Sequence, residues 1–273
     1  MVDTRFLFRP VAAELVGILE RLQPDDFERP TLAPLWRVRD IVAHLTDTHW
    51  RRLSFQRDRL VPPPPPGPIA SERDLTAMIN RWNNEFVDVF RRFSGRVLAA
   101  NYAAASRQLA DFFESLPLDA PALFPVSWAG ESASAGWFDI GREFTELWHH
   151  QMQIRDAVGE PPLADPRYLR AVLEIAVLGL PHAYRAVAAP AGTVLVIRAV
   201  GPAGGEWTLR CDARGWRIVP GGATSPEASA VIGDEALGRL LFNALGDGAA
   251  AAVAVDGRRD LVEPLLRARS VIV

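Results

Sequence analysis

The stretch from Asp139 to Asp156 reads DIGREFTELWHHQMQIRD and contains two stripes of opposite character. Apolar residues recur in it at the three- and four-residue spacing of one face of an α-helix, so this face must pack against a hydrophobic core. A neighbouring face is polar and holds Glu146 and His150. Residues four apart lie one helical turn apart, with their Cβ atoms about 5–6 Å from each other. The stretch therefore predicts an amphipathic helix whose polar stripe borders the interior and offers two ligands to one metal ion.

A third histidine of interest lies on a second predicted helix, which extends from about Arg37 to Leu60. His44 is three residues after Ile41, on the side of this helix that is expected to be buried. If the two helices are neighbours in a bundle, His44 can meet Glu146 and His150. Two histidines and one carboxylate with room for water form the open arrangement of catalytic zinc. The residues alone leave a second interpretation open, in which the polar stripe is a solvated helix face and the histidines are hydrogen-bonded core residues.

Helical periodicity extends through the N-terminal half of the chain. The proline run Pro62–Pro66 interrupts it, and because proline cannot continue a helix, this run is expected to form a stiff extended spacer. Ser71 is expected to cap the helix that follows through its side chain. Helices are expected at about 11–22, 37–60, 71–93, 96–116 and 138–158, which makes residues 1–158 an all-helical domain.

The segment Gly159–Pro166 is rich in proline and acidic residues and is typical of a linker between domains. One further helix, at about 167–187, precedes a change of pattern to short β-type runs separated by glycine and proline turns. Strands are expected at 193–200, 206–212, 216–219, 228–232 and 251–255, with helices at about 234–245 and from 259 on. The sequence thus predicts a second domain, residues 167–273, of the α+β class.

Composition excludes several kinds of chemistry. All 30 basic residues are arginine, so there is no lysine to form a Schiff base, act as a general base or bind phosphate. The single cysteine, Cys211, excludes an internal disulfide and any zinc or iron–sulfur site built from several of the chain's own thiolates. A metal must therefore be held by histidine and carboxylate. The net charge of −3 gives no general electrostatic footprint for nucleic acid or an anionic membrane, and neither is expected as a partner.

Targeting signals are not apparent in the sequence. The first ten residues lack the basic region, apolar stretch and small-residue cleavage site of a secretory signal. The longest apolar runs are well short of the roughly 18–20 residues that span a bilayer. We therefore expect a cytoplasmic protein without a transmembrane helix.

Two motifs in the helical half point to a family. The first is Trp36-Arg-Val-Arg-Asp-Ile-Val-Ala-His-Leu45, and the second is Glu146-Leu-Trp-His-His-Gln-Met-Gln-Ile-Arg-Asp-Ala-Val-Gly159. In this order they resemble the motifs of the mycothiol-dependent maleylpyruvate isomerase family, which belongs to the DinB-like helical bundles. The C-terminal half is similar to that family's second domain. The resemblance implies an α+β protein of two domains, a DinB-like bundle of four or five helices followed by an α+β domain of the sterol-carrier type.

The resemblance also implies a function. It assigns His44, Glu146 and His150 as ligands of a divalent metal, usually zinc. In the family the metal binds and deprotonates a low-molecular-weight thiol such as mycothiol, and the thiolate adds to a small electrophilic substrate or is transferred to it. An S-transferase or thiol-dependent isomerase is the expected activity. The proline-rich segment Pro62–Pro68 is a departure from the family pattern.

Arg81, beside Trp82 and Asn83, is the candidate for binding a carboxylate of the thiol or substrate by a two-pronged contact, with an ordinary surface arginine as the alternative. Two other functions stay open. One is a protein that binds a small apolar ligand and has a structural or vestigial metal. The other is a metal-dependent hydrolase, with Glu143 or His149 as general base. The expected partners are a small-molecule substrate and the thiol, and the chain is expected to be a monomer or homodimer.

Overall fold

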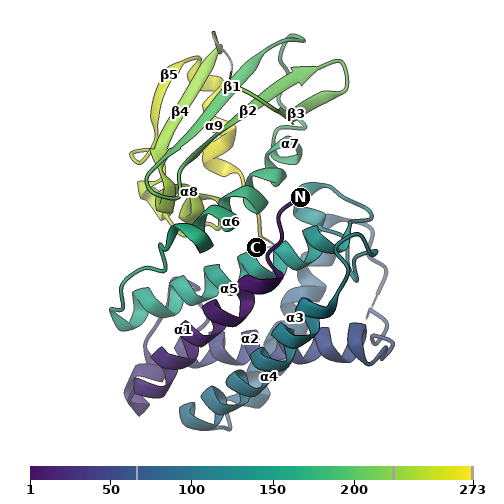
Figure 1. Ribbon diagram of the computed structural model, residues 1–273, viewed down its shortest axis with the longest axis vertical. Helices are drawn as coiled ribbons and strands as arrows, with labels where there is room; N and C mark the ends of the chain where they lie inside the picture. Colours follow the sequence, from purple (N-terminus) through teal and green to yellow (C-terminus); the bar gives the residue numbers. More distant parts are fainter. Residues whose placement is uncertain (66, 223–224, 272–273) are drawn as a thin grey trace. The chain divides into compact units, whose positions relative to one another are not determined.

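A computed structural model describes residues 1–65, 67–222 and 225–271 (Figure 1). By their internal contacts the residues form two compact units. A helical unit contains Asp3–Leu123 and Glu146–Pro162, and a sheet unit contains Phe124–Thr145 and residues 163–271, with the first two residues. The long helix α5 (Gly136–Val158) thus contributes its first part to the sheet unit and its second part to the helical unit. The boundary expected at 159–166 stays a prediction.

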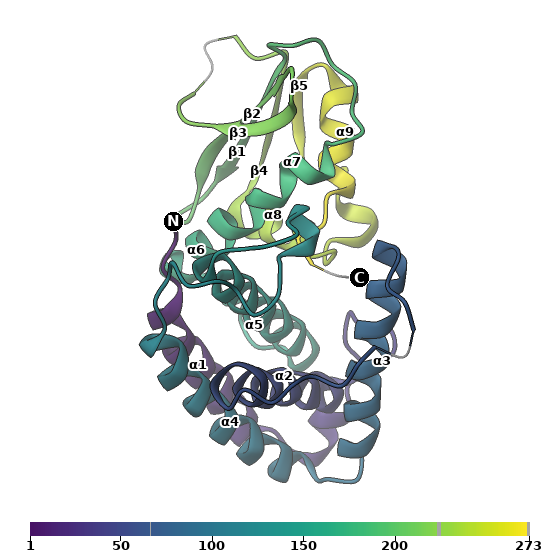
Figure 2. The same cartoon turned by 90° about the vertical axis from the view of Figure 1, so that its right-hand side faces the viewer.

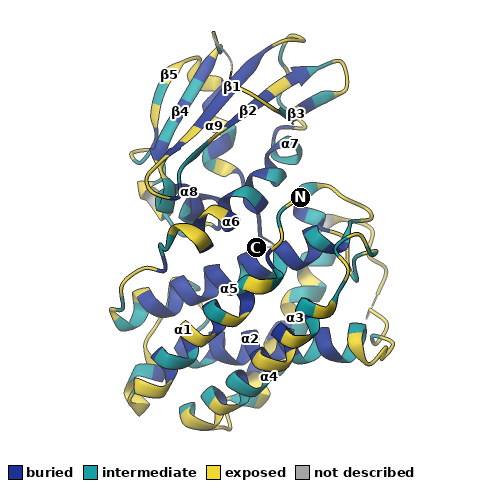
Figure 3. Ribbon diagram, viewed as in Figure 1, coloured by how far each residue is buried: buried dark blue, intermediate teal, exposed yellow. Residues whose placement is uncertain are grey.

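The helical unit is built from α1 (Phe8–Arg21), α2 (Val38–Arg52), α3 (Glu72–Phe90), α4 (Gly95–Ser115) and the second part of α5. Helix α4 packs against α1 and α2, and α3 packs against α2. Helix α5 is tied to α1 by an ion pair between Arg155 Nη2 and Glu14 Oε2 at 3.0 Å. Most of α2 and α5 is buried, as Figure 3 shows. The large, fully buried side chains of this unit include Leu15, Ile41, Leu45, Tyr102, Leu109 and Phe113.

The predicted helices of this unit are present, with ends within about three residues of those expected and one larger difference in extent. Helix α2 ends at Arg52 and is followed by a π-type turn, Leu53–Arg57, which the amide of Asp58 closes by donating to the Leu53 carbonyl at 2.9 Å. The expected continuation to residue 60 is therefore wrong, because the wide turn ends the α-helical hydrogen-bond ladder. No helix or strand is assigned in 58–65, in agreement with an irregular spacer; Pro66 lies outside the described residues.

Local signals fix where these helices begin and end. The Ser71 hydroxyl accepts from the amide of Asp74 at 3.2 Å and caps α3, as the sequence predicts. Gly159 ends α5 with a φ of +76°, in the left-handed region that glycine adopts at low cost. At the start of α4 a Cβ on Gly95 would lie 2.3 Å from the ring of Phe27, so this position requires the absence of a side chain.

The sheet unit has five strands in the order β3-β2-β1-β4-β5. The β1–β4 pair is parallel, and the β1–β2, β2–β3 and β4–β5 pairs are antiparallel. Helices α8 and α9 contact strands of this sheet, α8 against β1 and β4 and α9 against β4 (Figure 2). The elements after α5 are α6 (Pro166–Ala176), α7 (Leu180–Ala183), β1 (Val194–Val200), β2 (Gly205–Asp212), β3 (Gly215–Val219), β4 (Ala228–Gly233), α8 (Asp234–Leu241), β5 (Ala254–Gly257) and α9 (Arg259–Arg267).

These elements confirm the α+β class and correct three extents. The helix expected at about 234–245 ends at Leu241, with Phe242 as its C-cap. The helix expected at 167–187 is broken by the 3₁₀ turn Val177–Gly179 and ends at Ala183. Pro181 explains the break, since it has no N–H to donate to a preceding turn. The last strand begins at Ala254 rather than at 251, after a turn through the small residues that precede it. Within the described residues, no helix is long and apolar enough to cross a membrane.

Candidate metal centre

The position of His44 is set by the first turn of helix α2. The side chain of Asp40 accepts from the backbone N–H of Arg37 at 3.0 Å, which holds the first turn, and Asp40 also pairs with Arg91 at 3.1 Å. His44 follows one turn later and is 6% exposed, between the buried residues Ile41 and Leu45. Its imidazole is therefore enclosed in the bundle, on the face where the sequence predicts it.

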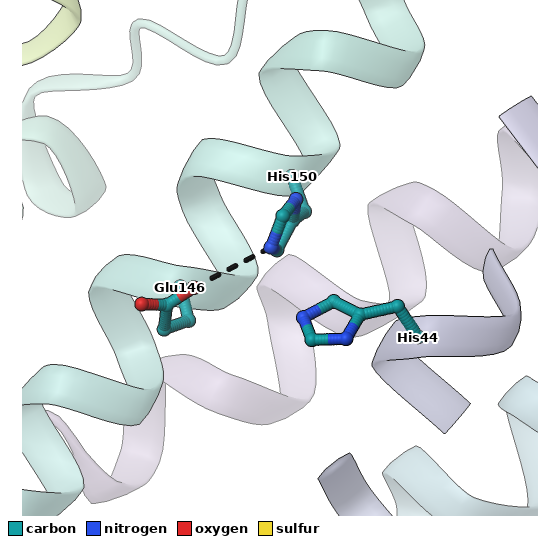
Figure 4. A group of neighbouring side chains, drawn as sticks. All are labelled: His44, Glu146 and His150. Carbon is teal, nitrogen blue, oxygen red and sulfur yellow. Dashed lines mark ion pairs between the residues drawn. The ribbon is translucent and has the colours of Figure 1, made fainter. Parts of the chain in front are cut away.

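Helix α5 positions the other two residues of the cluster. Glu146 and His150 are one turn apart on the same face, and Glu146 Oε2 lies 3.4 Å from His150 Nε2. One ligand atom from each of His44, Glu146 and His150 lies within 4.8 Å of the others. In Figure 4 the ring of His44 turns its outer nitrogen toward the other two side chains. The convergence that the sequence predicts is present, and metal binding itself stays a prediction.

Neighbouring rings and charges define the environment of His44. The ring lies 4.8 Å from that of Trp36 and 4.7 Å from that of His150, measured between centroids. Burial, followed by the electrostatic effects of His150 and Arg51, holds the pKa of His44 well below its usual range. A neutral imidazole has a lone pair available, which is the form that binds a metal.

The residues present fit a divalent metal. Zinc bonds to nitrogen and oxygen of about 2.0–2.2 Å place tetrahedral ligand atoms about 3.3 Å apart. The 3.4 Å between Glu146 and His150 is close to this separation. Two imidazoles and one carboxylate suit zinc and leave one position for a further ligand. His44 Nδ1 is buried and has no hydrogen-bond partner among the described residues.

The structure also brings together Asp47 and Arg51, two charged residues on the helix of His44 that the sequence motifs do not single out. Arg51 Nη2 lies 2.7 Å from Asp47 Oδ2 and 2.9 Å from Asn83 Oδ1. Burial raises the pKa of Asp47 to about 6, against the lowering effect of Arg51. Arg51 is seven residues after His44, two turns along the same helix face, and this spacing is the signal that would have found it.

Arg81 is not brought into the cluster. It lies on α3 with its side chain 60% exposed, and its Nε pairs with Glu85 Oε1 at 2.7 Å. Its neighbours Trp82 and Asn83 instead contact Arg51, whose Cζ lies 6.0 Å from the Trp82 ring centroid. The role expected for Arg81 stays a prediction.

Fold and cluster together define the class: a helical bundle followed by an α+β unit, with histidine and carboxylate side chains of two helices brought to one point. Residues 8–155 match the family model described as mycothiol maleylpyruvate isomerase N-terminal domain, which is more than half of the chain. The chain belongs to this family.

Solved structures are similar over nearly the full length. The crystal structure of the mycothiol-dependent maleylpyruvate isomerase and that of its histidine-to-alanine mutant each superpose with a TM-score of 0.53 at 13% identity. Each match covers 92% of this chain and 91% of the other. At this identity the likeness establishes the fold of both units, and the family assignment made from the two motifs is confirmed. No curated protein sequence matches the chain.

Proposed function

We propose that this protein is a metal-dependent enzyme that uses a low-molecular-weight thiol, as an isomerase or S-transferase acting on a small electrophilic substrate. One observation carries the proposal. His44, Glu146 and His150 offer ligand atoms within 4.8 Å of one another, in a chain of the mycothiol maleylpyruvate isomerase family. Mycothiol or a similar thiol is the proposed cosubstrate.

In this proposal His44, Glu146 and His150 hold one divalent ion, with zinc as the best-suited metal. The ion supplies a strong positive charge that lowers the pKa of a coordinated thiol. The protein's own contribution is to keep His44 unprotonated by burial and to leave Glu146, whose side chain is 25% exposed, at the open side of the cluster.

An external thiol fits the state of the chain's own cysteine. Cys211 is 6% exposed, lies in β2 and has its sulfur within 3.5 Å of the Ala189 carbonyl. A buried thiol with a hydrogen bond to backbone is a packing residue and a poor nucleophile. A thiol nucleophile for the proposed reaction must therefore come from outside the chain.

Arg81 is proposed to bind a carboxylate of the thiol or the substrate. Its present partner does not prevent this, because an exposed ion pair such as that with Glu85 contributes only about 0–1 kcal/mol. The guanidinium can exchange one carboxylate for another at little cost.

The first test is metal content. The purified full-length protein should contain one divalent metal per chain by elemental analysis, and His150→Ala should lose it. The second test is calorimetry of mycothiol binding in two buffers of different ionisation enthalpy, which counts the proton released when a thiol becomes a thiolate. Metal-loaded protein should release one proton, and chelated protein should not bind.

Variants separate the roles. Arg81→Ala should weaken binding of thiol or substrate and keep the metal, whereas Glu146→Ala should lose both. Arg73→Ala is the matched control, an exposed arginine on the same helix. Thiol binding that survives chelation would refute the proposal. If metal-loaded protein does not bind thiols and hydrolyses an activated ester, the result would support the metal-dependent hydrolase. If metal-free protein binds an apolar ligand, the result would support the binding protein.

A further inference from the structure

A buried glutamine joins the candidate metal ligand His150 to a second histidine. Gln153 is 7% exposed and lies on α5, one turn after both His149 and His150. Its side-chain oxygen Oε1 is 2.8 Å from His150 Nδ1. Its nitrogen Nε2 is 3.1 Å from His149 Nε2. A single amide thus contacts two imidazole rings, one with each of its ends.

The two ends of an amide have opposite hydrogen-bonding roles. In the amide orientation of the structure the oxygen faces His150 Nδ1 and only accepts, so this nitrogen donates and carries a proton. The nitrogen only donates, so His149 must accept through Nε2. In the neutral imidazole a proton on Nδ1 leaves Nε2 unprotonated, and Nε2 is the nitrogen that lies 3.4 Å from Glu146. The amide therefore selects the tautomer of His150 that can bind a metal through Nε2.

His44 has no equivalent support. Its Nδ1 is buried without a hydrogen-bond partner in the described part of the chain, and its ring is held by packing against Trp36. Of the two histidines in the cluster, only His150 has its orientation and tautomer fixed by a hydrogen bond of its Nδ1.

We propose that Gln153 is a positioning residue of the metal centre, which holds His150 with Nε2 directed at the metal and links it to His149. The inference rests on the proposed function for the identity of the site. It goes beyond the proposed function because it states that Gln153, which is not a proposed metal ligand, fixes the tautomer of the ligand His150. Hydrogen-bond partners of metal-bound histidines are worth about 10–100-fold in metal affinity.

Two variants of similar size separate the hydrogen bond from packing. Gln153→Leu fills the space and loses both contacts, so the zinc affinity of the full-length protein should fall about 10–100-fold. Gln153→Glu keeps an oxygen that accepts from His150 Nδ1 and should restore most of the affinity. Zinc affinity is measured by competition with a chromogenic chelator, with circular dichroism as the check that both variants are folded.

A metal-free readout tests the tautomer directly. Long-range ¹H–¹⁵N spectra of the chelated protein distinguish a proton on Nδ1 from one on Nε2. His150 should be the Nδ1–H tautomer in the parent protein and in Gln153→Glu, and should shift toward the Nε2–H tautomer in Gln153→Leu.

The outcomes separate this inference from the proposed function. Zinc binding that is equal in the parent protein and Gln153→Leu, or an affinity in Gln153→Glu as low as in Gln153→Leu, would overturn the role of Gln153 even if thiol binding is found. Loss of zinc in Gln153→Leu with no thiol binding by any variant would support the role of Gln153 and refute the function. If the parent protein binds no zinc, the function fails, and an Nε2–H tautomer of His150 in that protein would overturn the inference too.

Discussion

Replacing Asp47 by Asn tests how much a buried carboxylate on α2, the helix of His44, costs in stability. Asp47 is 3% exposed, and its carboxylate pairs with Arg51 at 2.7 Å. Burial raises the pKa of Asp47 from its ordinary 3.8 to about 6, and Arg51 offsets only part of this effect. The folded protein therefore carries a carboxylate that would be easier to ionise in the unfolded chain.

The direction and the size of the change in stability with pH follow from proton linkage. Below pH 3.8 the carboxyl is protonated in both states and its ionisation costs nothing. As the pH rises from 3.8 to about 6, the unfolded chain loses its proton first, so stability falls with pH. Above about 6 the full cost applies, about 3 kcal/mol at 1.36 kcal/mol per pH unit. An asparagine has almost the same shape and does not ionise, so Asp47→Asn should gain stability relative to the parent protein as the pH rises.

The assay is urea unfolding of the chelated full-length protein at pH 4, 5, 6, 7 and 8. The difference in unfolding free energy between Asp47→Asn and the parent should change by about 2.5 kcal/mol in favour of the variant between pH 4 and pH 7, because the unfolded carboxyl is already partly ionised at pH 4. Asp88→Asn is the control, because the Asp88 side chain is 67% exposed. A difference independent of pH, or one that moves against the variant at high pH, would mean that Arg51 outweighs the burial of the carboxylate and would refute the reasoning.

Two further predictions concern packing. Gly95→Ala introduces a Cβ 2.3 Å from the ring of Phe27, so the variant should unfold at lower temperature in calorimetry, with a loss of about 1–3 kcal/mol; an unchanged melting temperature would contradict the fit. Trp36→Leu removes the ring that lies 4.8 Å from His44, and should weaken zinc binding in the chelator competition by about tenfold while the circular dichroism stays the same. Equal zinc affinity would show that His44 needs no support from Trp36.

The parts of this structure that periodicity determines were predictable. The apolar stripe of α5 fixes which way the helix faces, and with it the meeting of Glu146 and His150, because a helix has only one geometry for residues four apart. His44 could be placed on the buried side of α2 for the same reason. These positions depend on the backbone and on burial, which the sequence pattern encodes directly.

The parts that depend on side-chain direction were not predictable. Arg81 and Arg51 are both arginines on helices of the bundle, yet one turns to Glu85 in solvent and the other turns inward to Asp47. The two contacts of Gln153 require both imidazole rings to be placed first. Likewise the early end of α2 arises from one wide turn after Arg52, and no residue type in that segment demands it.

The position of Trp36 next to the cluster should make its fluorescence sensitive to a bound metal. Its indole ring centroid lies 4.8 Å from that of His44 and 6.1 Å from that of His150, so an ion held by these imidazoles would be within a short distance of a fluorophore. Cobalt(II) and copper(II) quench indole emission at such range, whereas zinc does not absorb in the region of tryptophan emission. Although the chain has eight tryptophans, the difference between the parent spectrum and that of Trp36→Phe isolates this one. The protein would therefore contain its own reporter of which metal binds the proposed centre and how fast that metal exchanges.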